Sequence, residues 1–130
     1  TPGGQVEVDG VALIDADLFK SVNDTYGHQA GDAALRTIAS VISSCVRSSD
    51  ILIRYGGDEF LLLFPRIPKA TFQLRLEQIC KAVSAVSVPD YPELRLSVTV
   101  GGAYGVKPLD EAIRQADRQM YRRKAQRAQP

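Results

Sequence analysis

Short apolar runs and amphipathic periodicities divide the chain into seven expected elements. After a ten-residue lead-in with alternating polar positions, the apolar run 11–14 predicts a buried central strand. Residues 51–55, 59–64 and 94–102 predict three more strands. Apolar positions at helical spacing predict three helices, marked by Leu35, Ile38, Ala39, Ile42, Cys45 and Val46, by Phe72, Leu76, Ile79, Cys80 and Val83, and by Leu109, Ala112, Ile113, Ala116 and Met120.

The segments between these elements carry most of the chemistry. Residues 15–31 are rich in Asp, Asn and Gly and predict a loop, after which Asp32 opens a helix as its N-cap or first-turn acid. Gly56-Gly57-Asp58 separates two predicted strands, so it predicts a tight hairpin with glycines at positive φ.

The order strand, helix, strand, strand, helix, strand, helix predicts an α+β fold. It is the ferredoxin-like βαββαβ palm, a central antiparallel sheet flanked by helices, with an extra C-terminal helix. In that fold the first strand runs antiparallel to the third, beside it. Asp15 ends the first strand, whereas Asp58 and Glu59 begin the third. Three carboxylates should therefore converge at one edge of the sheet.

Composition narrows the function classes. The 130 residues fit one domain, and 45% apolar and 24% charged residues are typical of a globular protein. A net charge of +1 argues against nucleic acid as a partner. We see no signal peptide and no apolar run of the roughly 20 residues that a spanning helix needs. Cys45 and Cys80 lack metal or redox spacing, which predicts buried free thiols and a cytoplasmic setting.

Three converging acids repel one another unless a cation compensates their charge. Hard oxygen ligands suit Mg²⁺ or Mn²⁺, and a partial shell leaves room for substrate phosphates. Such a site is typical of phosphoryl or nucleotidyl transfer, with two metals about 3.5–4 Å apart. Taken alone, however, a Gly-Gly-Asp turn followed by solvated acids is the ordinary alternative.

Several segments, in order, resemble the GGDEF family of diguanylate cyclases. The resemblance covers about residues 11–124, and we treat 1–130 as one GGDEF domain. It rests on Asp15-Ala16-Asp17-Leu18-Phe19-Lys20-Ser21-Val22-Asn23-Asp24, Gly27-His28, Gly31-Asp32, Arg54-Tyr55-Gly56-Gly57-Asp58-Glu59-Phe60, Ser97-Val98-Thr99-Val100-Gly101, Ala116-Asp117 and Tyr121-Arg122-Arg123-Lys124.

The resemblance implies a bacterial signalling enzyme, with biofilm regulation as its setting, that joins two GTP molecules into cyclic di-GMP and releases two pyrophosphates. Each of two domains presents one GTP, and each 3′-hydroxyl attacks the α-phosphate of the other. Two Mg²⁺ or Mn²⁺ ions per site are implied. Their ligands would be Asp15, Asp58, Glu59 and the backbone carbonyl of Ala16.

The resemblance also assigns substrate contacts. Glu59 would help to deprotonate the attacking hydroxyl, and Lys20 and Lys124 would meet the terminal phosphates. Backbone amides from Phe19 to Asn23 would bind phosphate, and Gly56 and Gly57 would let the nucleotide approach the hairpin.

Asn23 and Asp32 would read guanine, since a carboxylate accepts hydrogen bonds from both N1–H and the exocyclic amine and adenine cannot offer that pair. The alternative is that Asp32 caps its helix and Asn23 shapes a turn. A lone loop histidine is usually structural, and His28 is interpreted in that way.

Arg47-Ser48-Ser49-Asp50 ends shortly before Gly56, where the family has its inhibitory product site. There the arginine would pair with guanine or phosphate of cyclic di-GMP, and the aspartate would take guanine N–H groups. The ordinary alternative is a polar helix exit.

The sequence also departs from the family. The usual Asp-x-Leu-Thr-Gly-Leu-x-Asn-Arg stretch and its helix are absent before the first strand, and Arg127 falls one position short of an expected arginine, where Ala128 stands. The isolated chain is therefore expected to bind GTP weakly or turn over slowly.

Three hypotheses stay open. The leading one is an active cyclase working as a homodimer under an N-terminal regulatory domain of a parent protein, whose membrane attachment is left open. The second is a catalytically silent module that binds GTP or cyclic di-GMP. The third is another palm-type nucleotidyl transferase.

Overall fold

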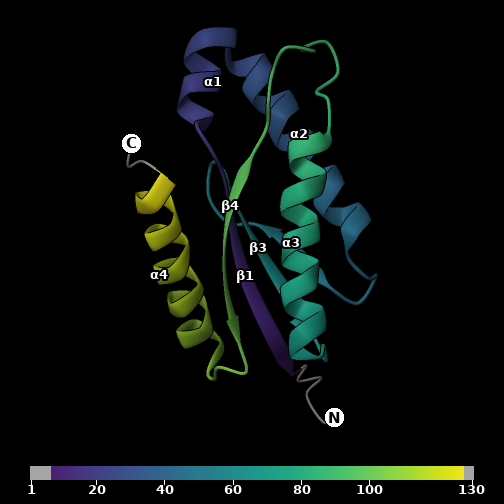
Figure 1. Cartoon of the computed structure of the whole chain (residues 1–130), viewed down its shortest axis with the longest axis vertical. Coiled ribbons are helices and arrows are strands. Elements are labelled where there is room, and N and C mark those ends of the chain that lie inside the picture. Colours follow the sequence, from purple (N-terminus) through teal and green to yellow (C-terminus); the bar gives the residue numbers. More distant parts are fainter. Residues whose placement is uncertain (1–6, 128–130) are drawn as a thin grey trace.

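The computed structural model describes residues 7–127, which form a four-stranded antiparallel sheet with helices on both faces (Figure 1). The strand order is β2-β3-β1-β4, so the first strand is central, as predicted. The elements are β1 (Val8–Ala16), α1 (Phe19–Tyr26), α2 (His28–Cys45), β2 (Ile51–Arg54), β3 (Glu59–Pro65), α3 (Lys69–Ala85), β4 (Val98–Tyr104) and α4 (Leu109–Arg127). The predicted α+β palm is confirmed.

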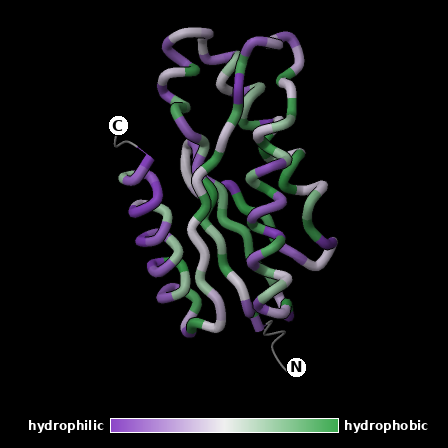
Figure 2. Tube along the Cα trace, viewed as in Figure 1, coloured by the Kyte–Doolittle hydropathy of each residue, from purple (hydrophilic) through white to green (hydrophobic). Residues whose placement is uncertain are grey.

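The sheet separates two apolar clusters because successive side chains of a strand point to opposite faces. On one face, α2 and α3 cover Ile14, Phe60 and Leu62 among others. On the other face, α4 packs over Leu13 and Leu61. The strands are apolar through the centre of the molecule, whereas α4 is hydrophilic over much of its length (Figure 2). Each helix therefore needs only one apolar stripe.

Gly101 lets α4 lie very close to β4. A Cβ atom at this position would fall 2.0 Å from the Ala116 carbonyl oxygen and 2.5 Å from the Met120 amide nitrogen. Both contacts are backbone atoms that cannot move aside, so alanine would push the helix away. This close approach brings the last turns of α4 to the end of β1.

Two helical predictions need correction. Residues 19–26 form α1 rather than loop, and α2 begins at His28, so Asp32 lies inside the helix and does not cap it. Val22 is the buried residue of α1, too weak a pattern to reveal a helix of eight residues. So short a helix is marginal in isolation and depends on packing against α2.

Two strand predictions also differ from the structure. β1 begins at Val8, within the expected lead-in, of which residues 1–6 lie outside the described part. Residues 94–97 are not strand, although Leu94 and Leu96 are buried. The β1–β4 ladder starts at the Ala16–Val98 pair because the chain turns into α1 just beyond β1, so residues 94–97 lack a strand there to pair with.

Three further features bear on the expectations. Cys45 and Cys80 are free thiols, as predicted, but half-buried. No helix within residues 7–127 is long and apolar enough to cross a membrane. Ile51 and Ile53 lie on the outer strand β2 and keep 41% and 40% of their surface exposed. This strand is therefore apolar at these two positions and uncovered there by the helices described.

Candidate active site

The carboxylates meet at the sheet edge that the topology predicts. Asp15 pairs with Glu59 in the antiparallel β1–β3 ladder. The Ala16 amide donates to the Asp58 carbonyl across 3.0 Å, which joins the end of β1 to the hairpin. Because the amide and carbonyl of an extended residue point to the same side of the strand, the Ala16 carbonyl also faces the hairpin. The expected convergence is confirmed.

Asp15 is the electrostatic centre of this edge. The residue is 6% exposed, and its carboxylate forms an ion pair with Lys124 from α4. Its Oδ1 atom is buried and has no hydrogen-bond partner among residues 7–127. Burial raises the pKa of Asp15 to about 6, with Lys124 opposing the shift and the charges of Asp58 and Glu59 adding to it. A carboxylate with an unpaired buried oxygen and like charges beside it suits a cation.

Glu59 lies in the same field of negative charge. Burial raises its pKa above the usual range, and the charges of Asp58 and Asp117 raise it further, against the effect of Lys124. Asp117, on α4, belongs to one of the segments that resemble the family, but the sequence assigned it no function. Its nearness to Glu59 follows from the packing of α4 along β4.

Arg54 fixes the hairpin between β2 and β3. Its guanidinium donates to the carbonyls of Gly56 and Gly57 and lies 5.9 Å from the ring centre of Phe60. Neither glycine has positive φ, so that expectation was wrong; among the described glycines, Gly27 and Gly105 do. Hydrogen bonds from Arg54 shape the turn instead. A Cβ at Gly57 would meet open space, so the hairpin surface is accessible there.

The carboxylate edge has the chemistry of a metal site but is not assembled as one. Within residues 7–127, no three His, Cys, Asp or Glu side chains are arranged to enclose a metal ion. The Lys124 ammonium instead neutralises Asp15. The unpaired Asp15 Oδ1, the adjacent hairpin acids and the inward Ala16 carbonyl are hard oxygen donors that fit Mg²⁺ or Mn²⁺. The donor set therefore fits the metal.

The expected guanine readers come from two adjacent helices. Asn23 lies on α1 and Asp32 on α2. The Asn23 Oδ1 atom is buried, and no residue in the described part of the chain donates a hydrogen bond to it. A Cβ on Gly31 would fall 1.8 Å from that oxygen, so glycine is what admits the Asn23 side chain. Asp32 itself is exposed.

The expected phosphate-binding segment is the first turn of α1. Phe19 begins the helix, and Lys20 is exposed beside it. The Val22 amide donates to the Leu18 carbonyl across 3.0 Å and is not free. Of the backbone amides expected to bind phosphate, residues 19–23, only those of the first three residues of the helix, 19–21, are therefore free to do so.

Arg47 and Asp50 bind each other. The Arg47 guanidinium contacts the Asp50 carboxylate at 2.7 Å and the carbonyls of Pro65 and Arg66 at 2.8 and 3.1 Å. The Arg47 backbone amide also donates to Asp50 at 2.7 Å. The side chain of Asp50 is 0% exposed and that of Arg47 38%. The pair fastens the α2–β2 turn to the end of β3.

Asp17 is a site residue that sequence reasoning missed. Its carboxylate accepts hydrogen bonds from Ser97 and Thr99 at 2.7 and 2.6 Å and pairs with Arg127 of α4. The Asp-x-Asp spacing was visible in the sequence. The partners, some 80 and more residues away, were not.

The raised pKa of Asp15 predicts a pH-dependent difference in stability from an Asp15→Asn variant. A carboxyl whose pKa is about 6 in the folded protein, against an ordinary value of 3.8, holds its proton more tightly when folded, so wild type loses stability as the pH rises through that window. Asparagine does not ionise. The free energy of unfolding, variant minus wild type, should therefore rise between about pH 4 and about pH 6 and level off above.

Urea titrations of both proteins without divalent cations, from about pH 4 to about pH 7, measure this difference. A difference that stays constant or falls with pH would contradict the assigned environment of Asp15.

Comparison with known proteins agrees with this geometry. The family model "Diguanylate cyclase, GGDEF domain" matches residues 6–130. Diguanylate cyclase DgcM of Escherichia coli K12 is 40% identical over 112 residues, covering 86% of this chain and 27% of that protein.

Two solved structures are similar in fold. Diguanylate cyclase SiaD of Pseudomonas aeruginosa, in complex with its activator SiaC, matches with a TM-score of 0.84 and 31% identity over 92% of this chain and 47% of that one. The GGDEF domain of DgcB from Caulobacter crescentus, in complex with c-di-GMP, matches with a TM-score of 0.80 and 32% identity over 89% of this chain and 71% of that one.

The chain thus spans about a quarter of the length of one curated relative and about half of one structural relative. The family match covers nearly all of its own residues. Sheet order, paired carboxylates and family match agree, and the chain belongs to the GGDEF domain family of diguanylate cyclases.

Proposed function

We propose that this domain condenses two GTP molecules into cyclic di-GMP as one half of a catalytic homodimer. The observation that supports this best is the β1–β3 register, which pairs Asp15 with Glu59 and leaves a buried Asp15 oxygen without a partner. A purely structural carboxylate at this position would be fully hydrogen-bonded.

The chain's own residues divide the work. Asp15, Asp58, Glu59 and the Ala16 carbonyl would hold two Mg²⁺ or Mn²⁺ ions, which when bound supply positive charge to the α-phosphate and the leaving pyrophosphate. Glu59, whose pKa is raised by burial, accepts the proton of the 3′-hydroxyl. The oxygen then forms a bond to the α-phosphorus of the partner's GTP, and the bond to pyrophosphate breaks.

Lys124 would exchange partners when the nucleotide binds. In the free protein its ammonium pairs with Asp15. Once that carboxylate ligates a cation, Lys124 is released to meet the terminal phosphates, together with Lys20 and the first amides of α1. One lysine thus neutralises Asp15 and then the substrate.

Guanine selection is assigned to Asn23 and Asp32. The unpaired Asn23 Oδ1 supports this, because a buried acceptor without a donor is costly until a ligand supplies one. Asp32→Ala should lower kcat/KM for GTP by about a hundredfold and cost little with ATP, because a site built for hydrogen bonds rejects what cannot make them.

The check is kcat/KM for both nucleotides in wild type, Asp32→Ala and Asp24→Ala, an exposed acid on α1 that serves as control. Equal losses for GTP and ATP would argue that Asp32 acts on the fold rather than on the base.

Product inhibition at Arg47 and Asp50 is a further part of the proposal. A similar GGDEF domain, that of DgcB, was solved in complex with c-di-GMP. In the present chain Arg47 is committed to Asp50 and two carbonyls. Product would therefore have to draw the guanidinium away from these contacts.

The setting is proposed from the same resemblance. We place the domain in the cytoplasm, within a parent protein that carries an N-terminal regulatory domain. Its role there is in cyclic di-GMP signalling. The exposed Ile51 and Ile53 are compatible with a covering segment in a longer protein.

Incubation with GTP and Mg²⁺, followed by mass spectrometry, tests the function. Cyclic di-GMP formed in proportion to the square of enzyme concentration at low concentration would show both the product and the dimer. If neither this chain nor a longer form with the preceding segment yields product, the silent receptor is the better description, and binding of cyclic di-GMP by calorimetry tests that.

A further inference from the structure

The last turns of α4 are tied to the end of β1 by two ion pairs. Lys124 binds Asp15, and three residues later Arg127 binds Asp17. These two cations, one helical turn apart, meet carboxylates two residues apart, on the same side of the strand end. Their environments differ, and the difference suggests different roles.

Asp17 is a fully satisfied carboxylate. Ser97 and Thr99 donate hydroxyl hydrogen bonds to its two oxygens at 2.7 and 2.6 Å, and its own amide donates to the Ser97 carbonyl at 2.9 Å. Arg127 adds an ion pair and donates to the Thr99 hydroxyl at 3.0 Å. Asp15, by contrast, keeps one oxygen without a partner. Asp17 is thus closed to a new ligand, and Asp15 is open to one.

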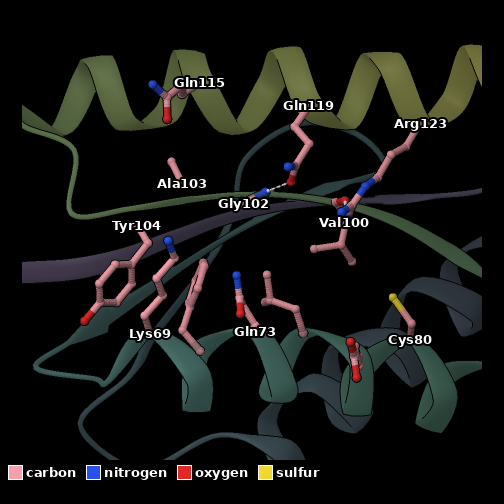
Figure 3. Close-up of a pocket in the computed structure, with 13 residues that line it drawn as sticks. Lys69, Gln73, Cys80, Val100, Gly102, Ala103, Tyr104, Gln115, Gln119 and Arg123 are labelled. Carbon is pink, nitrogen blue, oxygen red and sulfur yellow. Dashed lines mark hydrogen bonds between the residues drawn. The ribbon is translucent and has the colours of Figure 1, made fainter.

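Arg127 also ends a row of contacts along the outer edge of β4. Gln119 accepts a hydrogen bond from the Gly102 amide at 2.7 Å, and Arg123 donates to the Val100 carbonyl at 2.7 Å. Figure 3 shows both side chains reaching from α4 to this strand. They line a groove of about 620 Å³ between α3 and α4. Residues 119, 123 and 127 are four apart and lie on one face of the helix, so α4 is fixed along its length and at its end.

Within the described part of the chain, Lys124 makes no comparable contact with the backbone of β4. Its partner in the structure is Asp15, the carboxylate that the proposed function gives to the metal. When that contact is lost, the position of the ammonium depends on how the helix end is held. Arg123, just before Lys124, is held by the Val100 carbonyl. Within residues 7–127, the contacts that hold the turn after Lys124 without involving the metal ligands are those of Arg127 with Asp17, Thr99 and Val98.

We propose that Asp17 and Arg127 are positioning residues, a clamp that keeps Lys124 at the catalytic edge after Asp15 has exchanged it for metal and nucleotide. The inference rests on the proposed function. In this proposal Arg127 binds Asp17 and does not contact the phosphates of the nucleotide. It does so although Arg127 lies near the carboxylate edge and its positive charge would attract phosphate.

A double-mutant cycle on nucleotide binding tests the clamp. The probe is a GTP analogue whose α–β phosphate link cannot be cleaved, with Mg²⁺, titrated by calorimetry into wild type, Arg127→Ala, Lys124→Ala and the double variant. If Arg127 acts through Lys124, each single variant should bind about tenfold more weakly. The double variant should then bind the analogue only slightly more weakly than Lys124→Ala alone, because both substitutions remove the same contact between Lys124 and the nucleotide. Additive losses would overturn the clamp, since they would mean that Arg127 meets the nucleotide itself.

Asp17→Asn tests the same ion pair from the side of the carboxylate, and Arg122→Ala is the control. Arg122 is an exposed arginine on the same helix. Asp17→Asn should weaken binding as Arg127→Ala does, Arg127→Lys should restore most of it, and Arg122→Ala should leave it unchanged. Full affinity in Asp17→Asn would refute the proposal.

Hydrogen exchange of residues 121–127 gives a readout independent of nucleotide. Arg127→Ala and Asp17→Asn should both speed exchange in this last stretch of α4, whereas Arg122→Ala should not. Unchanged exchange would refute the anchoring role. If neither this chain nor a longer form with the preceding segment binds the analogue, the proposed function is wrong and the positioning role falls with it. Normal binding with additive losses overturns the clamp alone.

Discussion

An Asp15→Asn variant should lose cyclic di-GMP formation by roughly a thousandfold or more, equivalent to about 4 kcal/mol of transition-state stabilisation. Asp15 carries the open oxygen at the carboxylate edge, and its charge is what a metal ion would bind. Asparagine keeps the shape and can still accept a hydrogen bond from Lys124, but it offers no charge. The loss should appear in kcat/KM at saturating Mg²⁺.

Asp15→Asn should not lower the stability of the folded protein at neutral pH without Mg²⁺. Ionised Asp15 is buried beside Asp58 and Glu59, which is unfavourable, and this unfavourable environment is what raises its pKa. A melting temperature equal to or above that of wild type, without Mg²⁺, would separate lost chemistry from lost folding. Asp24→Asn, on the exposed side of α1, is the matched control for activity. Activity within tenfold of wild type would remove Asp15 from the metal site.

The second large effect is expected at Arg47, where replacement by alanine should lower the free energy of unfolding by about 2 kcal/mol. Asp50 would stay buried without its counterion, keeping the hydrogen bond from the residue 47 amide. The carbonyls of Pro65 and Arg66 would lose a donor as well. Urea denaturation measures the loss. Arg47→Ala combined with Asp50→Ala should be more stable than Arg47→Ala alone, since no unpaired buried charge is left.

Product inhibition should weaken at the same position. Because Arg47→Ala also disturbs the fold, Arg47→Lys is the better test: lysine can still pair with Asp50 but cannot form the two-pronged contact of a guanidinium. Its inhibition constant for cyclic di-GMP should rise about tenfold with initial turnover unchanged. An unaltered inhibition constant would leave the Arg47–Asp50 pair with its structural role alone.

Much of the architecture could be read from local pattern. The apolar run 11–14, the hairpin at Gly56-Gly57-Asp58 and the stripe of α4 each carried a strong signal, and the order of elements admitted few topologies. From that order alone Asp15 could be placed beside Asp58 and Glu59. The ladder pairing of Asp15 with Glu59 shows why this worked: strand register follows from the alternation of buried side chains.

Other features had no local signal. α1 buries a single side chain, so its helix is decided by α2 packing against it. The buried segment with Leu94 and Leu96 has the apolar alternation of a strand, yet pairing needs a neighbour that β1 no longer provides. The turn at Gly56 and Gly57 follows hydrogen bonds from Arg54 instead of positive φ.

The sequence by itself thus determined the family, the fold and the acids at the sheet edge, because these depend on periodicity, order and short motifs. The tertiary structure decided which charges meet. Lys124 neutralises Asp15, and Arg127 locks onto Asp17, because α4 approaches β4 closely over Gly101. Contacts between residues about 110 positions apart depend on helix placement to within an ångström or so, and that placement is set by packing, which no local pattern encodes.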